Sequence, residues 1–192
     1  MAAILQAAAQ VFSEVGFDVA TTTLIAQRAH TAIGSLYAYF PNKEAIAQRL
    51  CEQFCDDMRL LFEGILTDDL VQVPLSQVID AILDPLVEYH QTHLGFDVLW
   101  LTSQDDPRLA RMHQELNEVL TRKTAQIFAK RYPQCDAATA LRTSQICIRT
   151  VQALFPLAGD GPALDRQIIV ELKTMIHAYL HTVFGEDKGE GR

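Results

Sequence analysis

Apolar residues recur at helical spacing from the start of the chain. Ile4, Ala8 and Val11 lie three or four positions apart, a spacing that places their side chains on one face of a helix. Gly16 follows at the point where a residue in the left-handed backbone conformation commonly ends a helix. The pattern predicts a helix over residues 4–15.

Two shorter helices are predicted next. A threonine within residues 21–23 can begin the first of them, because its hydroxyl accepts a hydrogen bond from an N–H group that the helix leaves unpaired. The second presents Ile33, Leu36 and Phe40 on one apolar face, and Pro41 ends it. A longer helix followed by two short helices that are joined by a tight turn is the helix-turn-helix arrangement.

The rest of the chain is also helical by the spacing of its apolar residues. Pro85 falls inside one of these helices, and because proline lacks an N–H and clashes with the preceding turn, we expect a kink near Leu83. The tail at residues 185–192 is polar and glycine-rich, so it is expected to be disordered. The sequence predicts an all-α fold with nine helices and no strand. The last six helices are expected at residues 43–64, 74–94, 96–101, 107–131, 136–157 and 162–184.

The composition is that of a globular chain. Apolar residues make up 49% of the sequence, but charged residues interrupt them before any run reaches the length of about 18 that a membrane span needs. No basic segment precedes an apolar stretch at the N-terminus, so no secretory signal is expected. We therefore expect a cytoplasmic protein with no membrane partner.

The formal net charge of −8 argues at first against a nucleic-acid partner, because neutralising phosphates needs clustered lysine and arginine. The charge is unevenly distributed, however. Within residues 1–49, Arg28, Lys43 and Arg49 are balanced by three acidic residues, so the negative excess lies in the larger remaining part. The charge of the N-terminal part is therefore compatible with DNA binding.

The four cysteines form no CxxC pair and are expected to be reduced thiols. Cys51 and Cys55 stand four apart and are expected to pack on a helix face rather than to sense oxidants. The other two, Cys135 and Cys147, are expected to behave as small apolar residues.

Two histidine pairs at helical spacing could each present two imidazoles to a metal ion. They are His90 with His93 and His177 with His181. Neither pair has a third ligand close by in the sequence, so no metal site and no cofactor is expected. The chain also lacks a nucleophile elbow, a phosphate-binding glycine loop and a paired-carboxylate motif, so no enzyme activity is expected.

A longer pattern of residue identities runs from Ile4 to Ile46. It combines Ala7-Ala8, Phe12, Gly16-Phe17, Thr21-Thr22, Ile25-Ala26, Ala29, Gly34, Leu36-Tyr37-Ala38-Tyr39-Phe40 and Lys43-Glu44. This pattern, which covers about a quarter of the chain, strongly resembles the DNA-binding domain of TetR-like (tetracycline-repressor-like) regulators. The remainder is similar to that family's second domain in length and layout only. The resemblance implies a helix-turn-helix DNA-binding domain at residues 1–47 and a six-helix ligand-binding and dimerisation domain at residues 48–184.

The exposed side of the third helix is the expected DNA-reading surface. Small residues there allow the backbone to sit deep in the major groove, where base edges carry a distinguishing hydrogen-bond code. Ser35 can bond a base edge or a phosphate, and Tyr37 and Tyr39 can donate phenolic hydrogen bonds to phosphates. For Ile33, contact with a thymine methyl and burial within the protein are both open. The candidate DNA-binding residues are Thr22, Thr23, Ile33, Gly34, Ser35, Tyr37, Ala38, Tyr39 and Lys43.

Several of these roles are implied by the resemblance. Lys43 is similar to the family's phosphate-contacting lysine, and Thr22 and Thr23 direct a hydroxyl and a helix N-terminus at a phosphate. The sequence departs from the family's pattern in the turn, where His30 replaces the usual glycine and must adopt the turn conformation. Thr31 is expected to take over the cap of the third helix. The chain also lacks the basic arm that many relatives carry before the first helix.

Bulky apolar residues with a few polar groups gather in the middle helices, and they are expected to line a pocket for a small-molecule effector. Plain core packing is the alternative for each of them. The proline inside one helix and the break at Gly95 favour a void in this region. The candidate ligand-binding residues are Phe54, Met58, Tyr89, His90, His93, Phe96, Trp100, Met112 and Phe128.

The last two long helices carry apolar stripes. A terminal helical hairpin with more apolar surface than one protomer can cover is suited to a homodimer interface. The stripes consist of Leu141, Ile148, Val151 and Phe155, then Leu164, Ile168, Leu172, Met175 and Leu180.

The sequence thus predicts a ligand-responsive transcriptional repressor. It would bind a near-palindromic operator as a homodimer, and a small apolar or amphipathic effector would release it. Repression is implied by the resemblance to the TetR-like family, and activation of transcription is the alternative. The rival class is a helical small-molecule carrier with a vestigial helix-turn-helix, which the low basic charge favours.

Overall fold

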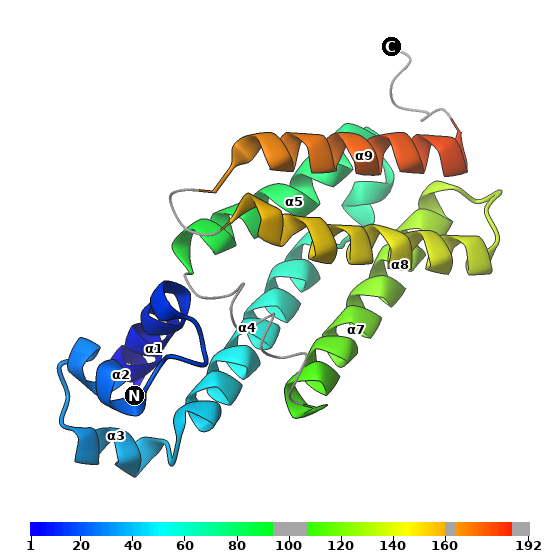
Figure 1. Cartoon of the computed structure of the whole chain (residues 1–192). Helices are drawn as coiled ribbons and strands as arrows, with labels where there is room; N and C mark the ends of the chain where they lie inside the picture. Colours follow the sequence, from blue (N-terminus) through cyan, green and yellow to red (C-terminus); the bar gives the residue numbers. More distant parts are fainter. Residues whose placement is uncertain (94–106, 160–163, 186–192) are drawn as a thin grey trace. The chain divides into compact units, whose positions relative to one another are not determined.

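The computed structural model describes residues 1–93, 107–159 and 164–185. Within these ranges the chain has eight of the nine expected α-helices and no strand, which confirms the all-α expectation (Figure 1). The short helix expected to end at residue 101 accounts for the difference, since it lies outside the described residues. The α-helices are α1 (Ala2–Val15), α2 (Thr22–Arg28), α3 (Ile33–Tyr39), α4 (Lys43–Ile65), α5 (Leu75–Thr92), α7 (Pro107–Arg131), α8 (Ala137–Leu154) and α9 (Arg166–Phe184), with 3₁₀ helices at Asp68–Val71 and Phe155–Ala158.

The chain forms two compact units. The first contains Met1–Asp57 and the described part of His90–Gln114. The second contains Met58–Tyr89, Glu115–Gly159 and the described part of Ala163–Arg192. These packing units do not test the boundary expected at residue 47 between a DNA-binding and a ligand-binding domain, which stays a prediction.

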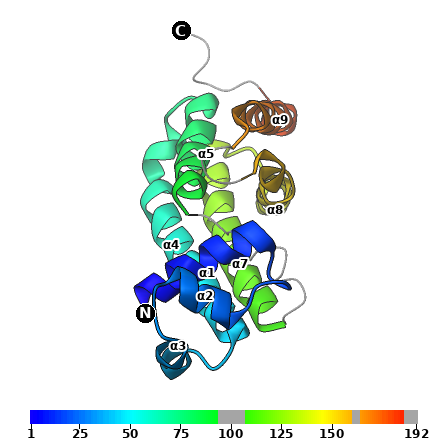
Figure 2. The same ribbon diagram turned by 60° about the vertical axis from the view of Figure 1, so that its left-hand side comes forward.

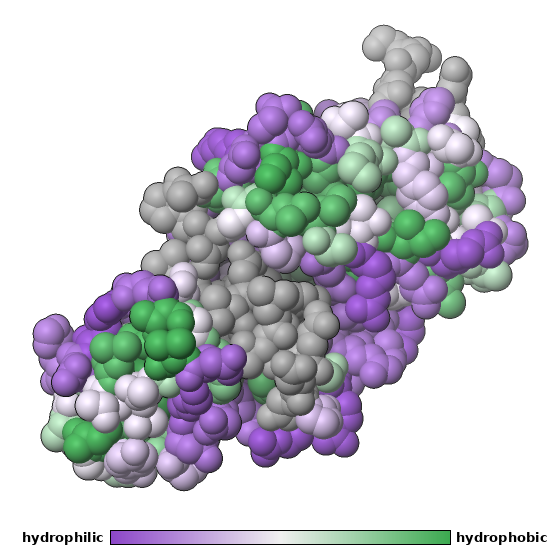
Figure 3. Space-filling model, in the orientation of Figure 1, coloured by the Kyte–Doolittle hydropathy of each residue, from purple (hydrophilic) through white to green (hydrophobic). Residues whose placement is uncertain are grey.

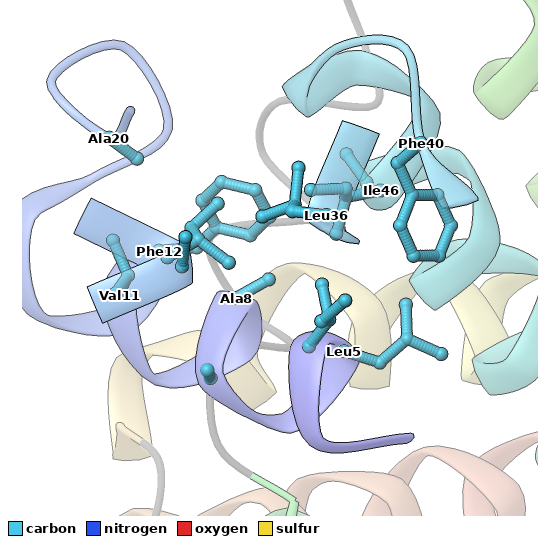
Figure 4. Packing of buried hydrophobic residues seen from close by; sticks show 13 residues of the cluster. Leu5, Ala8, Val11, Phe12, Ala20, Leu36, Phe40 and Ile46 are labelled. Atoms are coloured by element: carbon cyan, nitrogen blue, oxygen red, sulfur yellow. The ribbon is translucent and has the colours of Figure 1, made fainter. Parts of the chain in front are cut away.

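The core of the first unit joins α1, α2, α3 and the start of α4 (Figure 4). Phe12 from α1, Leu36 from α3 and Ile46 from α4 are all 0% exposed. Each such side chain contributes about 1.5–3 kcal/mol by leaving water, so the three short helices are held by this shared core rather than by their own length. Gly16 ends α1 with φ 79°, as the sequence predicts.

The start of α2 and the turn before α3 agree with the sequence prediction, but the cap of α3 does not. Thr21 caps α2 as expected, because its Oγ1 accepts a hydrogen bond from the N–H of Leu24 at 3.1 Å. His30 does adopt a positive φ, of 50°. The expectation that Thr31 caps α3 is wrong: the N-cap residue is Ala32, which offers no side-chain hydrogen bond.

In the second unit, α8 and α9 lie side by side (Figures 1 and 2). Asp165 caps α9 through a hydrogen bond from the N–H of Gln167 at 2.8 Å, so α9 begins at Arg166 and not at residue 162 as expected. The ring of Phe184 at the other end of α9 stacks on Tyr132, the residue that directly follows α7, with centroids 4.2 Å apart. Helix α5 runs through Pro85, and the kink expected there stays a prediction. None of the helices within the described residues is both long and apolar enough to cross a membrane.

Candidate nucleic-acid interface

Helix α3 divides into a buried and an exposed face. Leu36 and Phe40 anchor it, with 0% and 6% of their surface exposed. The remaining residues form what we call the outer face of α3, and all of them are exposed. The outer face consists of Ile33, Gly34, Ser35, Tyr37, Ala38 and Tyr39.

Ile33 belongs to this outer face and does not anchor the helix. Its side chain is 40% exposed, so it does not share the buried face that its spacing from Leu36 and Phe40 predicted. Ile33 is the first residue of α3, and no other element covers it fully. Of the two roles left open by the sequence, apolar contact with a ligand such as a thymine methyl fits this exposure.

Gly34 is exposed on the outer face, and a Cβ added to it would meet nothing within 4 Å. The fold itself therefore does not require glycine at this position. The missing side chain instead leaves room on the outside of the helix, where another molecule can approach the backbone closely.

Two hydroxyl groups connect the outer face to the start of α2. Oγ1 of Thr22 and the phenolic oxygen of Tyr37 are 3.0 Å apart and share a hydrogen bond. Tyr37 is 51% exposed, so its hydroxyl can also bond to an outside partner. Thr23, next to Thr22 in the first turn of α2, is exposed.

Lys43 holds the loop that precedes α2. Its Nζ donates hydrogen bonds to the carbonyl oxygens of Phe17, Asp18 and Ala20 at 2.8, 3.0 and 3.2 Å. The same ammonium group lies 4.7 Å from the centre of the Phe17 ring, a favourable cation–π distance. An ammonium group has three protons, so in this conformation all of them are used within the protein.

The other basic residues of this region are also paired. Arg28 donates two hydrogen bonds of 2.6 Å to the Glu14 carboxylate, and this guanidinium holds the pKa of Glu14 below its ordinary value. Arg49 lies 3.5 Å from Glu52. The exposed surface of residues 1–49, all of which the structure describes, thus offers neutral hydrogen-bonding groups and little free positive charge.

The candidate ligand-binding residues are divided between the two units. Phe54, His90, His93 and Met112 fall in the first unit, and Met58, Tyr89 and Phe128 fall in the second. Phe128 packs against Phe184, with ring centres 5.3 Å apart, which favours the core-packing alternative for this residue. His93 is exposed, whereas His90 is 2% exposed. Phe96 and Trp100 lie outside the described residues, and the pocket stays a prediction.

The expected apolar stripes on α8 and α9 are only partly available to a partner. Figure 3 shows hydrophobic side chains gathered over these two helices. Phe155, Leu164, Leu172 and Leu180 are buried, while Ile148, Val151 and Ile168 are half-buried. The exposed large apolar residues of α8 and α9, which we call the α8–α9 patch, are Leu141, Ile146, Val170 and Met175, between 40% and 53% exposed.

One group of side chains in the described part of the chain has the composition of a metal site. Cys51 and Cys55 on α4 and His113 on α7 place their ligand atoms within 4.8 Å of one another. The sequence predicted no metal site and did not group these residues, since Cys51 and His113 are 62 positions apart. The spacing of the two cysteines was the only available signal.

The buried helix-turn-helix core and the exposed outer face of α3 define a helix-turn-helix DNA-binding protein. Residues 4–50 match the family model "Bacterial regulatory proteins, tetR family". Residues 74–180 match the model "Tetracyclin repressor-like, C-terminal domain". The chain therefore belongs to the tetR family of bacterial regulatory proteins, whose members are DNA-binding transcriptional regulators and not enzymes.

Curated relatives resemble only part of the chain. The HTH-type transcriptional regulator YvdT of Bacillus subtilis (strain 168) is 32% identical over 96 residues, which are 50% of this chain and 48% of the relative. The A-factor receptor protein of Streptomyces griseus is 37% identical over 68 residues, 35% of this chain and 25% of the relative. The matches thus span about half or less of the length of these relatives.

Solved structures share the fold over nearly the whole chain. A TetR-family transcriptional regulator from Streptomyces coelicolor is 25% identical with a TM-score of 0.61, covering 95% of this chain and 98% of that one. A TetR transcriptional regulator from Legionella pneumophila reaches a TM-score of 0.71 at 15% identity, covering 92% and 94%. The second likeness concerns the fold alone.

Proposed function

We propose that the protein represses transcription by binding a near-palindromic operator as a homodimer, and that a small apolar or amphipathic effector releases it. The observation that carries the DNA-binding part is the outer face of α3, where small residues and two tyrosine hydroxyls surround a helix that only Leu36 and Phe40 anchor. Such a face can enter the major groove, with Gly34 and Ala38 near the bases and Tyr37 and Tyr39 near the phosphates.

The contacts of Lys43 refine its proposed role. Because its Nζ donates to three carbonyl oxygens of the preceding loop, Lys43 contributes mainly by fixing that loop and thereby the start of α2. The first N–H groups of α2 and the Thr22 and Thr23 hydroxyls then face a phosphate.

The homodimer rests on the α8–α9 patch. Exposed apolar side chains lie on two adjacent helices, and in the proposed dimer a second copy of the same hairpin covers the part of them that faces it, giving a four-helix bundle. The dimer sets the separation of the two α3 helices, which must be about 34 Å or a multiple of it to reach successive major grooves. An effector acts by binding more tightly to a form with a different separation.

The first experiment is selection of bound sequences from a pool of genomic DNA fragments at about 50 and 200 mM salt. We expect enrichment of a palindromic site by the native protein and none by Tyr37→Ala, with Leu60→Ala on α4 as an exposed control. The affinity should fall with salt with a log–log slope no steeper than about −5 for the dimer, since residues 1–49 of each protomer contain only three cationic side chains and each neutralised phosphate contributes about −0.9. Absence of enrichment at the lower salt concentration would favour the carrier alternative.

A further inference from the structure

Three soft or borderline metal ligands meet inside the first unit. Cys51 and Cys55 stand one helical turn apart on α4, and His113 lies in the second turn of α7. The Nε2 atom of His113 is 3.2 Å from the Sγ atom of Cys51, and the three ligand atoms all lie within 4.8 Å of one another. All three side chains are buried, with 2%, 4% and 7% of their surface exposed.

We propose that Cys51, Cys55 and His113 bind a thiophilic divalent cation, zinc(II) in the first place. Two sulfur ligands and one imidazole, without a carboxylate, suit zinc and disfavour magnesium and calcium, which take oxygen ligands. Zinc accepts three protein ligands when a further molecule completes its tetrahedron.

The separation of the Cys51 and His113 ligand atoms fits one ion with a small adjustment. Zinc–sulfur and zinc–nitrogen bonds of about 2.3 and 2.0–2.1 Å place a sulfur and a nitrogen ligand about 3.6 Å apart across a tetrahedral angle. The present separation of 3.2 Å between Sγ of Cys51 and Nε2 of His113 therefore has to open by about 0.4 Å. A change of this size lies within the reach of side-chain rotation alone.

The three side chains also offer suitable donor atoms. The neutral imidazole of His113 has a ring nitrogen whose lone pair can bind a cation. The edge of the Phe54 ring packs against this imidazole, with centroids 6.3 Å apart and an interplanar angle of 85°, which helps to fix its orientation. Each thiol loses its proton to the solvent as its metal–sulfur bond forms.

Charge balance favours a divalent over a monovalent ion. Two thiolates and one zinc(II) ion sum to zero, whereas two thiolates and copper(I) leave one negative charge in a buried place, which is costly. The ion would connect α4 to the start of α7 within the first unit. Lys43, which fixes the loop before α2, is the first residue of the same α4.

The test uses the full chain, reduced and freed of metal, titrated with Zn²⁺ against a chromogenic zinc chelator. We expect one ion per chain, release of about two protons per ion, and a higher thermal midpoint with zinc present. Titration with Cd²⁺ should give thiolate-to-metal absorption with the same stoichiometry. These measurements contain no DNA, so their outcome is independent of the proposed repressor function.

Substitution of the ligands makes the test specific. Cys51→Ser, Cys55→Ser and His113→Gln should each weaken zinc binding by more than about 100-fold, because changes to groups outside the metal's ligand shell already cost 10–100-fold. Cys147→Ser is the matched control: Cys147 is also buried, lies in the second unit, and burial raises the pKa of its thiol to about 12. Zinc binding should be unchanged in this variant.

Three outcomes overturn the proposal. They are the absence of one-to-one zinc binding by the native chain, zinc binding that survives both Cys55→Ser and His113→Gln, and binding of copper(I) but not zinc by these residues. The native chain's Cd²⁺ absorption and proton release decide the matter even if a variant fails to fold.

Discussion

The phenolic oxygen of Tyr37 lies 3.0 Å from Oγ1 of Thr22, so a hydrogen bond joins the outer face of α3 to the start of α2. Both hydroxyls lie next to the surface that we assign to DNA. A hydroxyl can donate one hydrogen bond and accept two, so Tyr37 can bond Thr22 and a phosphate together. The pair thus ties the position of α3 to that of α2 at the interface.

The substitution Tyr37→Phe removes this hydroxyl and keeps the ring. We expect operator affinity to fall about tenfold or more, since a hydrogen bond to a charged group is worth about 1.5–3 kcal/mol, while the free energy of unfolding changes by less than about 1 kcal/mol. Fluorescence anisotropy with labelled operator and urea unfolding measure the two quantities. Unchanged affinity would show that the hydroxyl does not contact DNA.

Gly34→Ala separates folding from binding. A Cβ at this position meets nothing within 4 Å in the protein, and alanine is favoured over glycine in a helix by about 1 kcal/mol. We therefore expect the variant to be as stable as the native protein or more stable, and to bind operator at least about tenfold more weakly because the new methyl group obstructs the groove, a loss of about 1.4 kcal/mol.

Gly64→Ala provides the matched control for this experiment. Gly64 lies in the part of α4 that belongs to the second unit, and its added Cβ also meets nothing within 4 Å. It should gain comparable stability with no change in operator affinity. Equal affinities of the two variants would argue against close approach of DNA at Gly34.

Lys43→Met tests whether the loop before α2 depends on the ammonium group. Loss of the three hydrogen bonds to carbonyl oxygens should lower the free energy of unfolding by about 2 kcal/mol and weaken operator binding. Arg49→Met removes one positive charge from the same helix, where the only hydrogen bond described for Arg49 is a 3.5 Å contact with Glu52. That variant should lose less than about 1 kcal/mol. If urea unfolding showed that both variants lose the same free energy of unfolding, the loss would come from the missing positive charge and not from the hydrogen bonds of Lys43.

The cap of α8 should make stability depend on pH in acid. Asp136 accepts hydrogen bonds from the N–H and the hydroxyl of Thr139 at 2.8 and 3.0 Å, and these hold the pKa of Asp136 below its ordinary value of 3.8. A lowered folded-state pKa gives stability that is present above 3.8 and is lost as the pH falls through the lower value.

Asp136→Asn is the comparison for this titration. Asparagine retains an oxygen that accepts from Thr139 and is itself an effective cap, but it does not titrate. Its thermal midpoint should therefore fall less than that of the native protein on acidification below 3.8, the ordinary pKa of the aspartate. If the thermal midpoints of the two proteins fell equally with pH, the Asp136 cap would not be the source of the acid sensitivity.

Met175→Glu tests the α8–α9 patch as a dimer interface. Met175 is 52% exposed on α9, so the charge should leave the protomer folded while opposing a second copy. We expect a shift to monomer in sedimentation and a loss of operator affinity of about 100-fold or more, because two linked half-sites reinforce each other by that order. Leu60→Glu is the control, with Leu60 69% exposed on α4. A dimeric Met175→Glu variant would place the interface elsewhere.

The sequence predicted those features that depend on neighbouring residues. Thr21 caps α2 and Gly16 ends α1 because the groups involved are a few positions apart. The positive φ of His30 followed from a motif position where relatives carry glycine. Ile33 was misplaced, because helical spacing groups residues on a face but does not tell how far a neighbouring helix extends to cover it.

Contacts between residues that are far apart in the sequence were not predicted. Lys43 meets carbonyl oxygens that lie 23 to 26 positions earlier in the chain, so its role as a loop clamp depends on the folded backbone. The same holds for Cys51 and His113, which only the packing of α4 against α7 brings together. Every residue has a backbone carbonyl group, so the sequence does not indicate which of them accepts a hydrogen bond from Lys43.

The internal pairing of Arg28, Lys43 and Arg49 affects how the protein distributes itself over a chromosome. Attraction to arbitrary DNA is almost entirely electrostatic. A regulator whose cations are already engaged is held little by the millions of competing sites that a genome presents. A larger fraction of its molecules then stays unbound, so a modest operator affinity suffices to fill the operator.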